Sequence, residues 1–212
     1  MDTMELIKRA ELHLVDIHIR SASFSDDTKN KPYTVSASFC HVDWKLHKDD
    51  PSSVPMFKYI VDKSKLCRNK ETVDLHEAVQ MARDYDLKQL EKTGDDDHDD
   101  HETDEAPYVH AMEPKGFVFH ESRCGSTLVA NSLAAFDPDF TRVYSESGPP
   151  VEAAKAFNRD RRDSSIQLLR DVIYMMGRTN DPDEEHLFFK VQSIGSKSIW
   201  AFREGKFNLH CT

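Results

Sequence analysis

The sequence predicts an α/β fold, in which a partial parallel sheet flanked by helices follows a smaller α+β region at the N-terminus. Strand-like and helix-like segments alternate from residue 107 onward, which is typical of a parallel sheet with helices on its faces. An acidic run at 95–105 separates this half from the N-terminal region. The predicted units are therefore residues 1–94, an acidic linker at 95–106, and residues 107–212.

The N-terminal region contains two clear elements. Leu12 and Leu14, and then Ile17 and Ile19, are each two positions apart, which predicts a half-buried strand in 12–19. In residues 72–92 the apolar positions fall on one helical face, and Asp74 and Glu77 resemble a capping box, so a helix is expected. The four cysteines lack metal-ligand spacing and no secretion signal precedes them, so we expect reduced thiols and no zinc site.

The C-terminal half reads as three strands separated by helices. Strands are expected at residues 115–122, 141–147 and 186–195, and helices at residues 126–136, 151–158, 164–178 and 196–204.

The net charge of −10 is concentrated in one place, since residues 95–105 carry eight carboxylates and the rest of the chain is left with −2. No broad basic surface is expected, so nucleic acid is not a predicted partner. Low hydrophobicity and like-charge repulsion predict that the acidic linker is disordered. No stretch has the length and apolarity of a membrane span or a signal peptide, and the chain as written is expected in the cytoplasm.

The turn at residues 119–127 has the residue types of an anion site. A strand that turns into a helix gathers free backbone N–H groups at the positive end of the helix. Gly125 allows close approach of a ligand, Ser126 and Thr127 add hydroxyl groups, and Arg123 adds a planar cation. A nucleotide-hydrolysing Walker loop needs a lysine where Ser126 stands, so the sequence predicts a different phosphate-like ligand.

Residues 121–134 resemble the 5′-phosphosulfate-binding loop of the sulfotransferase family, whose P-loop-like fold binds 3′-phosphoadenosine 5′-phosphosulfate (PAPS). The family pattern is a basic residue, a serine, a glycine, two hydroxyl residues and an apolar residue. Cysteine replaces the serine in this chain, and the resemblance extends over residues 115–202. It implies PAPS as co-substrate, no metal, and a cofactor-binding set of Ser122, Arg123, Cys124, Gly125, Ser126, Thr127 and Leu128.

The resemblance also implies the reaction, which is sulfuryl transfer to a hydroxyl group on a carbohydrate, a protein tyrosine or a small alcohol. Arg123 would stabilise charge on the leaving phosphate. Glu146, at the end of the second strand, is expected to be the base, although it could equally cap the following helix. Lys190 could face the sulfonate or lie on the surface, and His120 and Glu121 are weaker candidates beside the loop.

The family binds the 3′-phosphate with an arginine on a later strand and a serine that begins the next helix. No such pair follows Phe202. We therefore expect a truncated member with an incomplete cofactor site and impaired transfer. The alternative is a non-catalytic module that keeps the loop as a nucleotide or anion site and acts by binding a partner.

Overall fold

The fold is that of a computed structural model, which describes residues 2–20, 23–24, 31–92, 108–121 and 123–207. The expected acidic linker at 95–106 and the candidate Ser122 lie outside the described residues.

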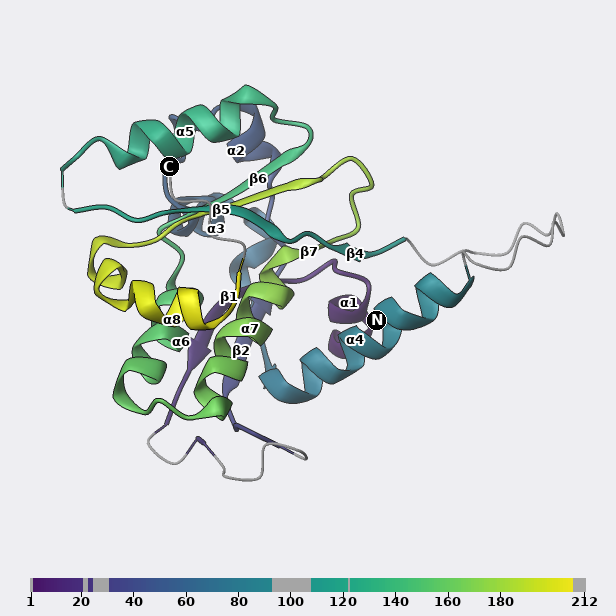
Figure 1. The fold of residues 1–212 in the computed structure, drawn as a ribbon. Coiled ribbons are helices and arrows are strands. Elements are labelled where there is room, and N and C mark those ends of the chain that lie inside the picture. Colours follow the sequence, from purple (N-terminus) through teal and green to yellow (C-terminus); the bar gives the residue numbers. More distant parts are fainter. Residues whose placement is uncertain (1, 21–22, 25–30, 93–107, 122, 208–212) are drawn as a thin grey trace, which may run out of the picture.

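A three-stranded parallel sheet forms in the C-terminal half, as the sequence predicts (Figure 1). Its strands are β5 (Pro114–Val118), β6 (Thr141–Ser145) and β8 (His186–Lys190). Their spatial order is β5–β8–β6, so the last of these three strands along the sequence lies between the other two and pairs in parallel with both. The elements around this sheet are β4 (His110–Ala111), α5 (Ser126–Phe136), α6 (Gly148–Arg159), α7 (Asp163–Gly177), β7 (Arg178–Thr179), the 3₁₀ helix η2 (Ser193–Ser198) and α8 (Ile199–Glu204).

Helices cover both faces of this sheet. Successive strand residues point to opposite faces, so Val143 and Phe188 pack with α5, while Tyr144 and Phe189 belong to the larger core on the other side. That larger core includes apolar residues of α6, α7 and α8. The predicted arrangement of a mixed α/β protein with a parallel sheet flanked by helices is therefore confirmed.

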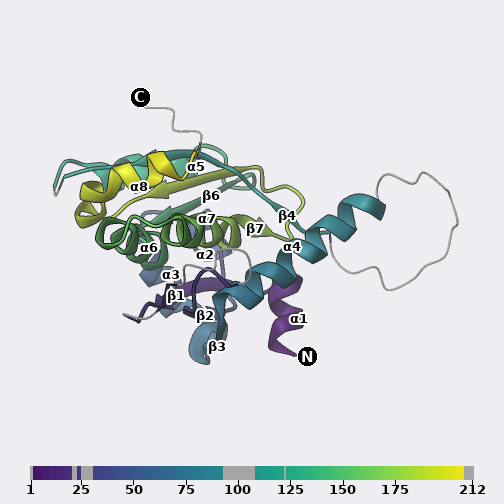
Figure 2. The same cartoon turned by 60° about the horizontal axis from the view of Figure 1, so that its bottom comes forward.

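The N-terminal region adds a second, antiparallel sheet in the order β1–β2–β3. The expected strand at 12–19 is confirmed as β1 (His13–His18). Figure 2 shows α6 and α7 between this sheet and the parallel sheet. The other elements of the region are α1 (Thr3–Lys8), β2 (Ser36–Cys40), α2 (Lys45–Asp49), α3 (Phe57–Lys63), the 3₁₀ helix η1 (Lys65–Arg68), β3 (Glu71–Asp74) and α4 (Leu75–Lys92).

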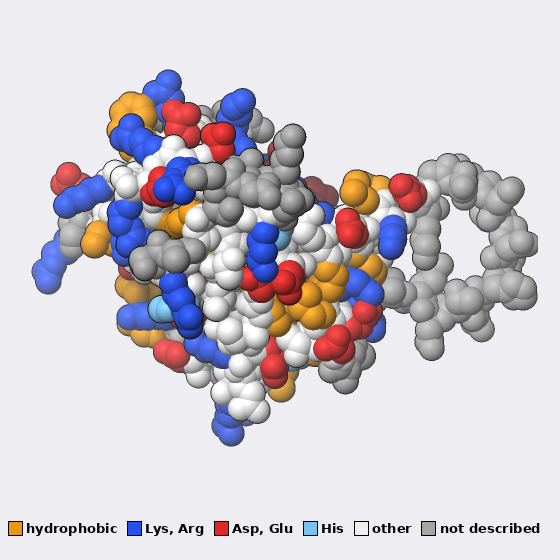
Figure 3. All heavy atoms as spheres, turned by 90° about the horizontal axis from the view of Figure 1, so that it is seen from below, with side chains coloured by type: hydrophobic (Ala, Val, Ile, Leu, Met, Phe, Trp, Pro, Cys, Tyr) orange, Lys and Arg blue, Asp and Glu red, His pale blue; other side chains and the backbone are white. Residues whose placement is uncertain are grey.

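Charged side chains of both signs share the surface. On the face drawn in Figure 3, Lys and Arg side chains are interspersed with Asp and Glu side chains. None of the helices formed by the described residues is long and apolar enough to cross a membrane.

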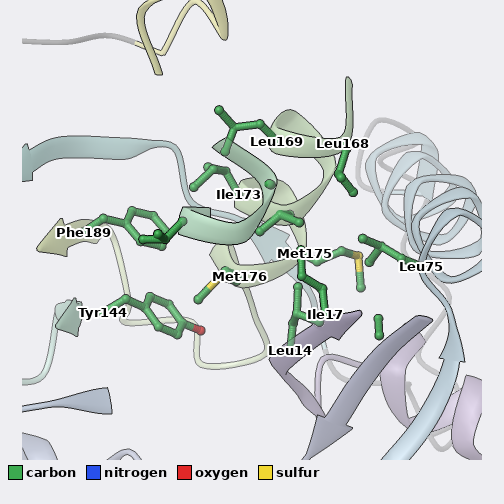
Figure 4. Close-up of a cluster of buried hydrophobic side chains, with 14 of the residues drawn as sticks. Leu14, Ile17, Leu75, Tyr144, Leu168, Leu169, Ile173, Met175, Met176 and Phe189 are labelled. Atoms are coloured by element: carbon green, nitrogen blue, oxygen red, sulfur yellow. The ribbon is translucent and has the colours of Figure 1, made fainter. Parts of the chain in front are cut away.

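A continuous core joins the two sheets through α7. Leu14 and Ile17 of β1 lie on one side of this helix, and Tyr144 and Phe189 of the parallel sheet lie on the other (Figure 4). Met176 of α7 is fully buried between them. The position of the parallel sheet therefore depends on packing against the N-terminal region as well as on its own helices.

Helix α4 begins three residues later than the sequence predicts. Residues 71–74 pair with β2 as strand β3, and this long-range pairing takes precedence over their helical pattern. The predicted cap is present, because the backbone N–H of Glu77 donates to Oδ1 of Asp74 at 3.2 Å. The helix then continues to Lys92 as expected.

The expectation of reduced thiols is wrong for Cys40 and Cys67, which form a disulfide. The end of β2 and the helix η1 bring their Cα atoms to 5.0 Å, a separation that a disulfide can span. The sequence gives no sign of this contact, because it joins residues 27 positions apart. Cys124 is an exposed free thiol.

Replacing both Cys40 and Cys67 by serine is expected to lower the free energy of unfolding by about 3.5 kcal/mol, since the bridge restricts a loop of this length in the unfolded chain. Urea unfolding of the non-reduced protein measures the change. Cys124→Ser is the control and should leave the unfolding midpoint unchanged. Equal midpoints for the double variant and the parent would show that the bridge does not stabilise the fold.

Candidate anion and proton-transfer site

The three parallel strands end at one edge of the sheet. In the strand register Val118 pairs with Lys190, and Lys190 pairs with Ser145. The pairing continues one step further, because the backbone N–H of Glu146 donates to the Lys190 carbonyl at 2.8 Å. The residues that follow β5, β6 and β8 therefore meet at this edge, which is where parallel sheets bind ligands.

The loop after β5 leads into helix α5 through two left-handed residues. Gly125, at φ = 85°, precedes the first residue of α5, and Arg123 has φ = 62°. A glycine adopts this conformation without strain, whereas it is uncommon for an arginine. Because α5 has 11 residues, its first N–H groups carry the partial positive charge of a full helix end.

The candidate loop residues differ in exposure. Arg123, Cys124 and Gly125 are exposed, and the Arg123 side chain makes no hydrogen bond or ion pair with any other described residue. Ser126 is buried and Thr127 is half-buried at the first turn of α5. The Leu128 side chain is 72% exposed and borders an apolar groove along α5. The loop therefore presents the Arg123 guanidinium, which has no partner among the described residues, beside a helix N-terminus.

Lys190 connects the loop to Glu146. Its side chain is 1% exposed, and its ammonium group donates to Glu146 Oε1 and, at 3.4 Å, to Thr127 Oγ1. An ammonium group this deeply buried requires such partners. Lys190 is therefore a buried member of the site, and its placement on the surface is excluded.

The backbone of Glu146 has a left-handed conformation, and both its N–H and its carbonyl group are hydrogen-bonded. Its φ is 56°, its N–H donates to the Lys190 carbonyl, and its carbonyl accepts a hydrogen bond of 3.0 Å from Gln192 Nε2. A left-handed glutamate costs free energy, so these bonds stabilise a specific direction of the side chain. Within the described residues only Oε1 of its carboxylate has a partner, and Oε2 makes no hydrogen bond.

His120 lies beside the pair formed by Glu146 and Lys190. Its Nε2 lies 3.8 Å from Glu146 Oε1 and has no hydrogen-bond partner among the described residues. Its Nδ1 lies 2.8 Å from the Glu121 carbonyl, which can only accept, so Nδ1 carries the hydrogen. Ser196 of η2 fixes the backbone, accepting from the His120 N–H at 3.1 Å and donating to its carbonyl at 2.8 Å.

The structure therefore brings together four of the side chains considered from the sequence, namely His120, Thr127, Glu146 and Lys190. Gln192 and Ser196 also support the site and were not expected. Gln192 could have been found from its position two residues beyond Lys190 at a strand end. Within the described chain, no group of three or more His, Cys, Asp or Glu side chains is arranged to hold a metal ion.

Comparisons of the chain with protein-family models, with curated proteins and with solved structures found no match.

Proposed function

We propose that the loop at 119–127 is P-loop-like and binds the 5′-phosphosulfate end of PAPS, and that the adjoining side chains assist sulfuryl transfer to a hydroxyl acceptor. The observation that carries the proposal is the buried Lys190 ammonium, which contacts both Thr127 at the start of α5 and the carboxylate of Glu146. A cation placed between an anion loop and a carboxylate is suited to a reaction in which negative charge develops at the loop.

The loop supplies three kinds of attraction for an anion. The first turn of α5 offers backbone N–H groups and the helix dipole. Arg123 adds an exposed guanidinium without a partner among the described residues, which can bind two oxygens of a phosphate or sulfonate at once. Thr127 adds a hydroxyl group that Lys190 already polarises.

Each side chain of the site has a role in the proposed transfer step. The acceptor oxygen attacks sulfur, the new O–S bond forms, and the bond from sulfur to the bridging phosphate oxygen breaks. Glu146 takes the acceptor's proton, with its unbonded Oε2 available for this contact. Arg123, the helix N-terminus and Lys190 stabilise the charge left on adenosine 3′,5′-bisphosphate. His120 lies beside Glu146 and contributes to its position.

The first test measures binding of adenosine 3′,5′-bisphosphate by calorimetry. Arg123→Ala is expected to weaken binding about 10- to 100-fold, because a hydrogen bond to a charged group contributes about 1.5–3 kcal/mol. Arg159→Ala, at the exposed end of α6, is the matched control. Equal affinity of the Arg123→Ala variant and the parent would contradict the assignment of Arg123.

The free thiol provides an independent measurement of the same site. Cys124 is exposed in the loop, so bound nucleotide is expected to slow its reaction with a maleimide. The experiment uses a Cys211→Ser background, in which Cys124 is the remaining unpaired cysteine. An unchanged labelling rate at saturating nucleotide would place the nucleotide elsewhere.

A second candidate function is a non-catalytic nucleotide or anion module. The Glu146–Lys190 ion pair favours it, because the carboxylate that would take a proton is already held by an ammonium group. Labelled PAPS with a panel of carbohydrates, tyrosine peptides and small alcohols separates the two functions. Turnover supports the transferase, whereas binding without turnover supports the module.

A further inference from the structure

Helix α5 is apolar on more sides than the one that packs on the parallel sheet. Its buried residues Ala130 and Ala134 belong to one apolar cluster with Phe188 of the sheet. The Leu128 and Phe136 side chains, by contrast, are 72% and 90% exposed. A helix that is apolar on several sides is normally covered on several sides. Part of the apolar surface of α5 therefore has no covering element among the described residues.

An apolar groove follows this uncovered side of α5. Its volume is about 890 Å³, which is within the range of small-molecule sites. Leu128, Val129 and Phe136 form its helix side, and Phe188 of β8 lies on its sheet side. Leu128 belongs to the first turn of α5 and Phe136 is its last residue, so the groove extends over about 12 Å. The groove is therefore long, narrow in chemistry and almost wholly apolar along the helix.

A cation lies at one end of the groove, and no acid among the described residues lines it. Lys115 of β5 and His186 of β8 line it near the amino ends of these two paired strands. The Lys115 ammonium makes no hydrogen bond or ion pair with any described residue. The acids beside the lining residues in the sequence, Glu113, Asp137 and Glu185, do not line the groove. An apolar surface is therefore combined with an unpartnered positive charge.

Two features argue against a second copy of the chain as the occupant. In a symmetric dimer the same patch meets itself, so Lys115 of one copy would face a groove without a carboxylate to pair with it. Strand β5, which has a partner on one side only among the described strands, begins with Pro114 and Lys115. Proline and lysine in an edge strand disfavour the addition of another strand. The occupant that fits is an apolar molecule with a negative charge of its own.

We propose that the groove binds a free, medium-chain anionic amphiphile, with its carboxylate at Lys115 and its alkyl chain along α5 toward Leu128. Burial of methylene groups against the exposed apolar side chains of α5 supplies the affinity. The ion pair with Lys115 fixes the direction of the chain in the groove. The inference does not rest on the function proposed for the loop.

Calorimetry of the parent chain with hexanoate, octanoate and decanoate, each below its aggregation concentration, tests the proposal. Decanoate is expected to bind saturably with a Kd below about 1 mM. Each added methylene group should tighten binding about two- to fourfold, because the groove buries the chain only in part. Octan-1-ol, which lacks the charge, should bind about two- to fivefold more weakly than octanoate, since Lys115 is exposed.

Matched variants test the two ends of the groove. Phe136→Ser is expected to weaken decanoate binding about five- to tenfold. Leu87→Ser, an exposed apolar residue of α4 outside the groove, should leave the affinity unchanged. Lys115→Met should abolish the preference for octanoate over octan-1-ol, and Lys115→Glu should give a preference for octylammonium instead. Lys88→Met, on α4, is the control for both and should keep the preference of the parent.

The remaining outcomes separate this groove from other sites and occupants. Arg123→Ala should leave decanoate affinity unchanged, because Arg123 does not line the groove. Absence of saturable decanoate binding, an affinity independent of chain length, or equal binding of octanoate and octan-1-ol by the parent would overturn the proposal. A dimer of the parent in sedimentation, lost in Phe136→Ser, would assign the groove to a second copy and would also overturn it.

Discussion

Replacing Arg178 by methionine is expected to lower the free energy of unfolding by about 3–5 kcal/mol, because it breaks a buried ion pair and leaves the remaining charge without its partner. The Arg178 side chain is 2% exposed and binds Asp86 of α4 through two hydrogen bonds of 2.7 and 3.0 Å. It also donates to the carbonyls of Ile7 at 2.8 Å and Lys8 at 2.7 Å, at the C-terminal end of α1. One side chain therefore holds three elements together.

Chemical denaturation measures this loss, and Arg159→Met on the surface of α6 is the control, expected to stay within about 0.5 kcal/mol of the parent. Arg178→Lys should give an intermediate value, since an ammonium group cannot reproduce the planar two-bond contact. A double-mutant cycle with Asp86→Asn should show coupling between the two sites. A loss below about 1 kcal/mol for Arg178→Met would contradict the structural role assigned to this residue.

On the proposed function, Glu146→Gln is expected to reduce the turnover number for sulfuryl transfer by about 10²- to 10⁴-fold, because the amide cannot take the acceptor's proton. The amide retains the size of the side chain and an oxygen that accepts from Lys190. The backbone contacts of residue 146 with Lys190 and Gln192 do not involve the carboxylate and should persist. The affinity for adenosine 3′,5′-bisphosphate should therefore be unchanged.

Labelled PAPS measures turnover, and calorimetry measures nucleotide affinity on the same preparations. Glu121→Gln is the matched control, since Glu121 is exposed and contacts His120 through its backbone carbonyl. Equal turnover of the Glu146→Gln variant and the parent would show that Glu146 does not take the acceptor's proton. Loss of turnover in the Glu121→Gln variant alone would indicate that Glu121, in the loop, is the base instead of Glu146.

The strands and helices of the C-terminal half could be predicted because their signals are local. The short apolar runs within 141–147 and 186–195 indicate strands without knowledge of their partners. The position of Glu146 near the loop also follows from the sequence, because parallel strands end at the same edge of a sheet.

The centre of the site could not be predicted, because it depends on the strand order. Only the insertion of β8 between β5 and β6 places Lys190 next to both Thr127 and Glu146. The contact of His120 with Ser196 and the bridge of Cys40 with Cys67 are likewise long-range. Local periodicity contains no information on such pairings, and it also placed the start of α4 too early.

The position of β8 has a consequence for the synthesis of the protein. Strands β5 and β6 leave the ribosome first, and neither pairs with the other in the finished sheet. Neither strand can therefore form its parallel pairing until residues 186–190 have been synthesised. Contacts this distant along the chain slow folding and leave unpaired strands exposed in the meantime. Because the same segment contains Lys190, Thr127 and Glu146 come into contact with this lysine only when the sheet itself is complete.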